Sequence, residues 1–346
     1  MTTRGSKMFL PCLEHPVTVT LVDDNPGYML GLAPRLDQTR FHYLMYKNPH
    51  RLLADMNAAK EERVFGQTIE CLKHNRTTGD AKLLLHLSQV HQDIYRLARY
   101  KQRAILLLDF DFDEEGFDGL ELCRQLKSPF VHIILLTGAL GEKQAIDAIN
   151  QGLIDQYILK YVPDFVAKIN AALIRGAHAY FRDVTNMLHG LLAPFAAQSA
   201  LNSMTASSFL RNQMEEHGFR EHYLCDPRGT QLLLKPSGDP HGLHLMTDPQ
   251  IEQLLATPQA SRAPASLVQD LRAGRLMLCI SNPDEPSWLP PGDEWPNYAR
   301  KAHPLVLDAK LACHYALVRG SILVDENRIA TFDDYKKQHP LGKVVE

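Results

Sequence analysis

The chain has 346 residues, of which 45% are hydrophobic and 22% are charged, and its formal net charge is −3. This length predicts two or more domains, and the composition is that of an ordinary globular protein. No run approaches the roughly 18 apolar residues of a membrane-spanning helix. The charge argues against a strong nucleic-acid binder, because residues 181–346 hold 16 basic and 19 acidic side chains.

The six cysteines are scattered along the chain, with no C-x-x-C pair. Such spacing is typical of reduced thiols in a cytoplasmic protein, and we therefore expect a cytoplasmic location. Residues 1–16 contain no apolar core long enough for a signal peptide, which fits that expectation.

The first half alternates short apolar runs with amphipathic segments. Strands are predicted at 17–22, 41–46, 105–108, 131–136 and 156–159, and helices at 26–36, from 49, at 120–126, at 142–151 and from 164. Apolar runs without polar alternation are typical of strands that are buried on both faces of a parallel sheet. The alternation of strands and helices predicts an α/β fold, a doubly wound parallel sheet with right-handed crossovers.

Polar signals follow directly on these apolar runs: the pair Asp23 and Asp24, then Asp109, Thr137 and Lys160. The carboxyl ends of parallel strands meet at one edge of an open α/β sheet, where ligands bind. Clustered carboxylates suit Mg²⁺, which takes hard oxygen ligands and often a phosphate oxygen as well. A lysine and a hydroxyl beside a carboxylate nucleophile complete the set that is needed to accept a phosphoryl group.

The same region contains five motifs in order: LVDDNP, LLLDFD, FDGLELCRQLK, ILLTGAL and DQYILK. Together they resemble the receiver domain of two-component response regulators, over residues 17 to about 180. The resemblance implies a CheY-like, five-stranded parallel sheet in which Asp109 is the phospho-acceptor and a Mg²⁺ ligand. Asp24 would bind the ion directly, Asp23 would help through water, and the backbone carbonyl of Asp111 would be a further ligand.

The resemblance also implies a switch and a partner. Lys160 would pair with the phosphoryl group, Thr137 would turn towards it, and Tyr157 would be the aromatic residue whose burial follows the threonine. Sensor histidine kinases would donate the phosphoryl group. The chain would not be an enzyme beyond the help that the receiver gives to its own phosphorylation.

Three features depart from the family pattern. The loop between Asp109 and Asp118 is longer than usual, which leaves Asp111 as a rival phospho-acceptor; Asp109 is favoured because it directly ends the apolar run. Tyr161 replaces the proline that commonly follows the lysine. A helical insertion at about 60–103 is interpreted as packing on the sheet, with a docking or dimerisation surface as the alternative. A pseudo-receiver would usually lack an acid or the lysine, and all are present here.

Apolar residues continue at helical spacing beyond the last receiver strand, which predicts one helix over 164–192. Such a helix either covers its own domain or pairs with a second copy in a phosphorylation-dependent homodimer. The predicted divisions are an N-terminal extension (1–16), a receiver domain (17–180), linker helices (181–217) and an output domain (218–346).

The second half has a different pattern. A helix is predicted over 203–217, closed by Gly218 as its C-cap, and short apolar runs separated by the turns PRG, SGD and PHG predict an antiparallel meander over 222–247. Short helices are predicted at 248–256 and 266–273, strands at 275–280, 313–318, 322–324 and 328–332, and a proline-rich loop at 281–296. This pattern predicts an α+β output domain.

The output half shows no phosphate-binding glycine loop and no helix-turn-helix with a basic recognition face. The spacing of His241 and His244 does not match a zinc site, so both are interpreted as surface or loop residues. The receiver with its helical insertion is followed by an output region that begins near FLRNQMEEHGFREHYL. In these two features the whole chain resembles the group of quorum-sensing response regulators typified by the Lqs system of Legionella, which implies a part in density-dependent gene regulation. The output domain would then act by binding a protein or a ligand. Direct DNA binding, and a nucleotide-binding or catalytic domain, are the alternatives.

Overall fold

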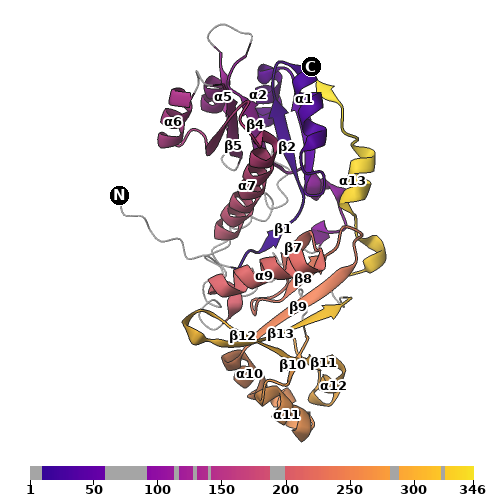
Figure 1. The fold of residues 1–346 in the computed structure, drawn as a ribbon. Helices are drawn as coiled ribbons and strands as arrows, with labels where there is room; N and C mark the ends of the chain where they lie inside the picture. Colours follow the sequence, from indigo (N-terminus) through magenta and orange to yellow (C-terminus); the bar gives the residue numbers. More distant parts are fainter. Residues whose placement is uncertain are drawn as a thin grey trace. The chain divides into compact units, whose positions relative to one another are not determined.

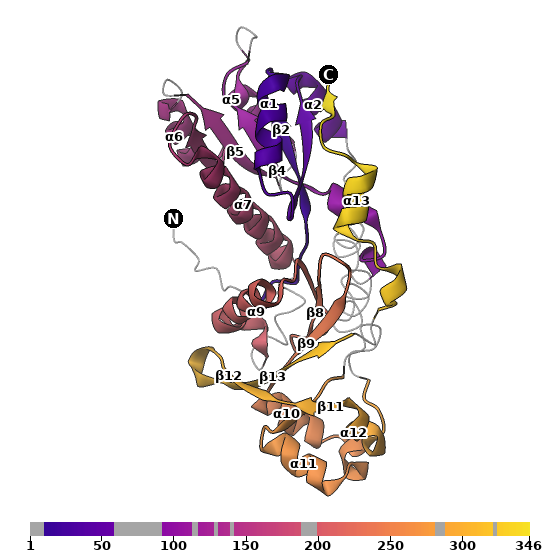
Figure 2. The ribbon, with the colours of Figure 1, turned by 45° about the vertical axis from the view of Figure 1, so that its right-hand side comes forward.

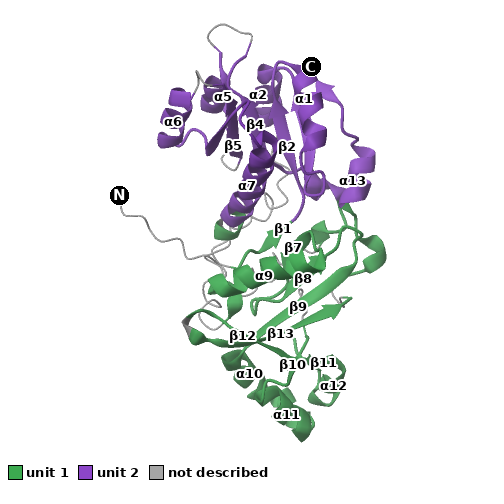
Figure 3. Cartoon of the chain, viewed as in Figure 1, with its two compact units in different colours: residues 1–14, 68–96, 184–331 green, residues 15–67, 97–183, 332–346 purple. Residues whose placement is uncertain are grey.

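The structure is a computed structural model that describes residues 10–58, 92–112, 117–127, 131–138, 142–187, 199–280, 288–320 and 324–346. The chain divides into two compact units, coloured separately in Figure 3. Unit 2 takes residues 15–67, 97–183 and 332–346, and unit 1 takes residues 1–14, 68–96 and 184–331. Each unit is thus assembled from three separate stretches of chain.

Unit 2 is built on a parallel sheet, seen at the top of Figures 1 and 2. Its strands are β2 (Val17–Val22), β3 (Phe41–Tyr46), β4 (Arg103–Asp109), β5 (His132–Thr137), β6 (Gln156–Leu159) and β14 (Val344–Val345). They pair in the order β14-β3-β2-β4-β5-β6, and each pair is parallel. The α/β, CheY-like prediction is confirmed, but the described sheet has six strands where five were predicted.

Helices cover both faces of this sheet. They are α1 (Pro26–Leu32), α2 (Pro49–Ala58), α5 (Gly119–Gln125), α6 (Glu142–Asn150) and α7 (Phe165–Met187). On one face α2, α5 and α6 share a buried cluster with Leu106 and Leu108 of β4. On the other face Gly176 of α7 approaches Ile105 and His132 closely. Because β4 is covered on both sides, its apolar run has no polar alternation.

The sixth strand comes from the end of the chain. Residues 328–332 were predicted as a strand of the output domain, but the backbone instead forms a short 3-10 helix, η8 (Glu326–Arg328), followed by α13 (Phe332–Gln338). Phe332 and Tyr335 are buried against Tyr100 of η2 (Leu97–Lys101), a 3-10 helix of unit 2. Residues 332–346 therefore belong to the receiver unit and not to the output domain predicted over 218–346.

Two predicted helical regions are described only in part. Residues 59–91 of the predicted insertion lie outside the described residues, and its described end includes η2, which leads into β4. The helix predicted over 164–192 is described as α7, up to Met187, and residues 188–198 lie outside the described residues.

Unit 1 contains an antiparallel sheet in the order β1-β7-β8-β9-β13-β12 and a separate pair β10-β11. The strands are β1 (Leu13–Glu14), β7 (Glu221–Leu224), β8 (Gln231–Leu234), β9 (Pro240–Thr247), β10 (Leu276–Leu278), β11 (Ala299–Lys301), β12 (His303–Val306) and β13 (Ala312–Arg319). The meander is confirmed, but the predicted PHG turn lies inside β9. The end of the predicted N-terminal extension supplies the edge strand β1, which pairs with β7.

The helices of unit 1 are α9 (Met204–His217), α10 (Asp248–Leu255), α11 (Ala265–Arg272) and α12 (Trp295–Tyr298). Gly218 caps α9 with φ +72°, as the sequence predicted. Trp295 is fully buried in a cluster with residues of α10, α11 and β10, which makes it a packing residue. Short 3-10 helices also occur: η1 (Ala33–Arg35) in unit 2, and η4 (Ala200–Asn202), η5 (Pro258–Arg262), η6 (Gly292–Glu294) and η7 (Asp308–Lys310) in unit 1.

Candidate functional site

The acidic pair stands in a fixed turn between β2 and α1. The Asp23 backbone N–H donates to the carbonyl of Tyr46 on the neighbouring strand at 3.3 Å. The Asp23 Oδ1 atom accepts from the Asn25 N–H at 2.8 Å, and the Asn25 side chain caps α1 by accepting from the Tyr28 N–H at 3.0 Å. Pro26 occupies the first helical turn, where its missing N–H is no loss. These contacts hold the Asp23 side chain at the carboxyl edge of the sheet.

The third carboxylate comes from the end of the central strand. Asp109 is the last residue of β4 and is 6% exposed. The chain then returns through Asp118, which caps α5 by accepting from the Glu121 N–H at 2.8 Å. A Cβ atom on Gly119 would lie 2.3 Å from the Asp109 carbonyl oxygen, so this position requires glycine. The FDG motif is therefore part of the scaffold that places Asp109.

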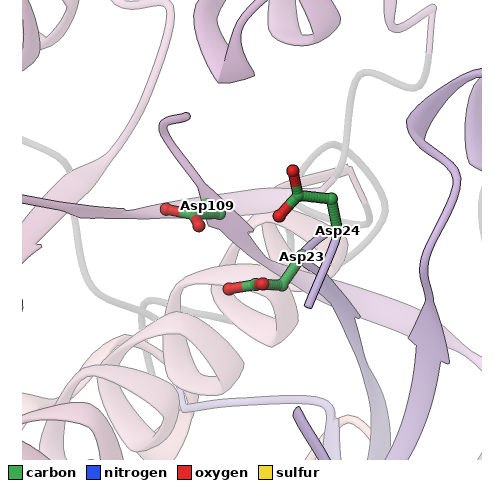
Figure 4. Close-up of side chains that lie close together, drawn as sticks. All are labelled: Asp23, Asp24 and Asp109. Atoms are coloured by element: carbon green, nitrogen blue, oxygen red, sulfur yellow. The ribbon is translucent and has the colours of Figure 1, made fainter. Parts of the chain in front are cut away.

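Figure 4 shows that Asp23, Asp24 and Asp109 lie together at this edge. One ligand atom from each lies within 4.8 Å of the others, so the predicted convergence of the three carboxylates is what the structure shows. The Asp23 Oδ2 and Asp109 Oδ1 atoms are buried and have no hydrogen-bond partner among the described residues. Buried carboxylate oxygens without donors fit a divalent cation with hard oxygen ligands, as Mg²⁺ is.

Lys160 approaches the cluster from the end of β6. Its Nζ atom donates to Asp109 Oδ2 at 2.7 Å and lies 3.7 Å from Asp23 Oδ2. Its backbone N–H donates to the Thr137 carbonyl at 2.7 Å, which ties the ends of β5 and β6 together. The next residue, Tyr161, has φ +66°, a value that the proline ring cannot adopt. The departure from the usual proline therefore reflects a different backbone turn after the lysine.

The surroundings of the cluster disfavour the charged form of its carboxyl groups. Burial raises the pKa of Asp23 to about 7 from its ordinary value of 3.8; the Asn25 N–H and Lys160 oppose this shift, and the Asp109 charge adds to it. Burial and the Asp109 charge also raise the pKa of Asp111. A bound cation would lower the pKa of both Asp23 and Asp111, because it favours the charged form of each carboxylate.

The two rival acceptors, Asp109 and Asp111, lie in different surroundings. Asp109 is buried in contact with Lys160, whereas the Asp111 side chain is exposed in the loop after β4 and lies outside the three-carboxylate group. This geometry favours Asp109, as the sequence did, and it leaves the Asp111 backbone carbonyl as a predicted metal ligand.

The predicted switch residues lie near the cluster but make other contacts. Thr137 is fully buried, and its hydroxyl donates to the Gly138 carbonyl at 3.1 Å. Tyr157 is half-buried, and its hydroxyl donates to the Glu142 carboxylate at 3.3 Å. Among the described residues neither hydroxyl is hydrogen-bonded to Asp109. Their movement on phosphorylation stays a prediction.

Tyr28 is a residue of this site that the motifs did not reveal. It lies on the first turn of α1, and its ring centroid is 4.9 Å from Lys160 Nζ. Its hydroxyl is buried without a hydrogen-bond partner in the described part of the chain. The sequence signal was its position: it follows the capping Asn25 by three residues, so one helical turn carries it back to the edge where Asp23 and Asp24 lie.

None of the helices described is both long enough and apolar enough to cross a membrane. No protein-family model matches the sequence, and no curated protein sequence matches it significantly.

Among solved structures, the chain is similar to the Legionella pneumophila response regulator LqsR, with 25% identity, a TM-score of 0.74 and 96% of each chain covered. It also matches the receiver domain of a Clostridium thermocellum response regulator (15% identity, TM-score 0.30, 47% of this chain and 94% of that one). A third match is the BeF3-activated receiver domain of DrrB (15% identity, TM-score 0.29, 47% and 98%). The similarity to LqsR confirms the predicted resemblance over nearly the whole chain.

Proposed function

We propose that this chain, which is similar to a two-component response regulator over nearly its whole length, accepts a phosphoryl group on Asp109 from a sensor histidine kinase. The contact between Lys160 and Asp109, inside a group of three carboxylates, carries the proposal. Lys160 holds one oxygen of Asp109, and the other is buried without a hydrogen-bond partner among the described residues. Asp109 supplies the carboxylate nucleophile and Lys160 the positive charge beside it, and both are parts that phosphoryl transfer requires.

Mg²⁺ is the cofactor that the donor set fits. Asp23, Asp24 and Asp109 would hold it, with the backbone carbonyl of Asp111 as a further ligand. When bound, the ion neutralises negative charge on the phosphoryl group. The protein's own residues position the reacting groups: Lys160 orients Asp109, and the turn at Asn25 keeps the acidic pair at the sheet edge. The chain would not be an enzyme beyond this help in its own phosphorylation.

The proposal includes an output. Movement of Thr137 and Tyr157 on phosphorylation would change dimerisation and the interactions of unit 1. Two isoleucines on α6, Ile146 and Ile149, are 44% and 37% exposed, and a second copy of the chain would cover this apolar surface. By its likeness to the Legionella regulator, the protein would act in density-dependent gene regulation. All five described cysteines are free thiols, which supports a cytoplasmic place of action.

The test is phosphorylation with acetyl phosphate and MgCl2, followed by Phos-tag electrophoresis. The wild-type protein is expected to shift, and Asp109→Asn is expected to remain unshifted because it lacks the nucleophile. Asp111→Asn is the matched control: it makes the same change two residues away, on an exposed side chain, and should shift like wild type. A shift in Asp109→Asn together with none in Asp111→Asn would establish the rival acceptor. No shift in the wild type would contradict the proposed function itself.

A further inference from the structure

Tyr28 differs from Thr137 and Tyr157, whose hydroxyls donate hydrogen bonds to other protein groups. The hydroxyl is buried, and no hydrogen bond satisfies it within the described residues. A buried polar group without a partner costs free energy, so such groups are uncommon unless something else satisfies them. Tyr43, also in unit 2, illustrates the usual arrangement: its hydroxyl donates to the Asp37 carbonyl at 3.0 Å.

Two contacts position Tyr28, one through its backbone and one through its ring. Its backbone N–H is held by the Asn25 side chain, and its ring lies over Lys160 Nζ at 4.9 Å from the centroid. A cation over an aromatic face is attracted to the ring, so this contact keeps the lysine and the tyrosine together.

The same edge holds two further buried oxygen atoms without hydrogen-bond partners, Asp23 Oδ2 and Asp109 Oδ1. These carboxylate oxygens can only accept, whereas the phenol can also donate. A divalent cation with a phosphoryl-type anion would satisfy all three, since the cation takes the carboxylates and the anion presents oxygens to a donor. One ligand at this edge therefore accounts for all three atoms.

We propose that the Tyr28 hydroxyl donates a hydrogen bond to the oxyanion that occupies this site, and that Tyr28 is therefore a further binding residue for the phosphoryl group. The inference rests on the proposed function and goes beyond its residue set of Asp109, Lys160 and Thr137. The ring contributes separately, by holding Lys160 in place. Substitutions that remove the hydroxyl alone, or the whole ring, separate these two contributions.

The experiment measures beryllofluoride, a phosphoryl analogue, binding to the full-length protein in saturating Mg²⁺ by isothermal titration calorimetry. Tyr28→Phe keeps the ring over Lys160 and removes only the donor. A hydrogen bond to a charged group corresponds to about a tenfold or larger loss of affinity when it is removed. We therefore expect Tyr28→Phe to bind beryllofluoride about tenfold more weakly, and Tyr28→Leu more weakly still, because it also loses the cation–π contact.

The matched control is Tyr43→Phe, which removes a phenol hydroxyl from the same unit, away from the acidic cluster, and should bind like wild type. The affinity for Mg²⁺ alone should change less than twofold in Tyr28→Phe, if the defect concerns the anion. The half-life of the aspartyl phosphate, formed with acetyl phosphate, should change in Tyr28→Phe and not in Tyr43→Phe.

Three outcomes overturn the inference in different ways. Equal beryllofluoride affinity in wild type and Tyr28→Phe means that the hydroxyl does not contact the anion. An equal loss of Mg²⁺ and beryllofluoride affinity means that the substitution only disturbs the metal site. A wild-type protein that binds no beryllofluoride and takes no phosphoryl group removes the proposed function as well, which distinguishes that failure from the other two.

Discussion

At the scale of single residues, the site is organised by carboxylates in an environment that disfavours their charge. Asp23 is 5% exposed and faces Asp109 and Lys160. Lys160 Nζ offsets the charge of Asp109 through a hydrogen bond of 2.7 Å. It lies farther from Asp23, at 3.7 Å from Oδ2, and therefore offsets the charge of Asp23 less. In the metal-free protein the ionised form of Asp23 is therefore unfavourable, and the stability of the folded state depends on pH through this group.

The first prediction concerns this pH dependence. Burial raises the pKa of Asp23 to about 7 in the folded protein, against an ordinary value of 3.8. The folded state then binds the proton more tightly than the unfolded state does, so the stability from this group is fully present below about pH 4 and is lost as the pH rises through about 7. We expect the Asp23 contribution to fall by on the order of 1–4 kcal/mol across this window, measured by thermal unfolding as the difference between metal-free wild type and Asp23→Asn.

The matched variant is Asp23→Asn, which removes the titrating group and should show a flatter dependence between these pH values. Saturating Mg²⁺ should act in the opposite direction, because the ion binds the deprotonated carboxylates and stabilises the folded state more as the pH rises. Identical pH profiles for the wild type and Asp23→Asn, both without metal, would show that Asp23 is charged like an ordinary aspartate.

At two positions, Gly119 and Gly176, the neighbouring atoms lie too close for any larger residue to fit without a shift. Gly119 allows the chain to pass against the Asp109 carbonyl, where a Cβ atom would lie at 2.3 Å. Gly176 stands in the middle of α7, where it weakens a helix, but a Cβ atom there would lie 2.6 Å from the ring of His132. Gly176 is therefore a point of close contact between α7 and β5.

At the scale of elements, the C-terminal segment changes the boundary of the receiver unit. Phe332 and Tyr335 of α13 pack on Tyr100, and β14 then pairs with β3, with Val344 beside Met45. A strand at the edge of a sheet exposes unpaired backbone groups, and β14 covers part of that edge. Residues 332–346 thus complete the sheet that carries the acidic cluster.

The second prediction concerns this segment. Tyr335 is 3% exposed, and its ring stacks on His339 with centroids 4.3 Å apart. Tyr335→Ala should destabilise unit 2 by about 3–5 kcal/mol, the usual cost of truncating a buried aromatic side chain. Thermal unfolding followed by circular dichroism measures the loss. Hydrogen exchange should also become faster at Lys47, whose amide donates to Val345 across the β3–β14 pair.

Lys337→Ala is the matched control for that measurement. It lies on the same helix, with its ammonium group exposed beside Asp334, and it should leave the unfolding midpoint unchanged. If Tyr335→Ala unfolds at the wild-type temperature with unchanged exchange at β3, the C-terminal segment is dispensable for the receiver unit.

At the scale of the whole molecule, the chain combines a parallel unit that carries the site with an antiparallel unit that has its own buried cluster around Trp295. The similarity to LqsR extends over 96% of the chain and therefore includes both units. Under the proposed function, phosphorylation in one unit would change what the whole protein binds, and dimerisation is the change that we propose.

The third prediction is that phosphorylation changes the mass of the assembly. Light scattering on full-length protein with acetyl phosphate and Mg²⁺ should give about twice the mass of untreated protein, because the proposed switch creates a homodimer interface. Asp109→Asn under the same conditions should keep the untreated mass. Phosphorylated wild type that keeps its mass would contradict the dimer switch and would leave rearrangement within one oligomeric state as the route to the output.

Much of the receiver unit could be predicted because its signals are local. Short runs rich in β-branched, aromatic and aliphatic residues predicted β2, β3 and β6 with their observed bounds, because such residues favour strands. The polar residues that follow those runs were predicted to converge, because parallel strands place their carboxyl ends on one edge. The order of motifs then sufficed to identify the resemblance to response regulators.

The remaining features depend on contacts between residues far apart in the chain. Residues 328–332 have a strand-like pattern, yet Phe332 begins a helix, because Tyr100 offers a buried aromatic partner that no local pattern reveals. The sixth strand is equally non-local, since β14 is only two residues long and exists through its pairing with β3. Likewise, Tyr28 belongs to the site because the folded sheet brings Lys160 beneath its ring. The sequence by itself predicted β2 to β6, the convergence of the carboxylates and Asp109 as the favoured acceptor. Only the tertiary structure decided which distant segments complete the sheet and the site, because burial and pairing depend on partners that the local sequence does not contain.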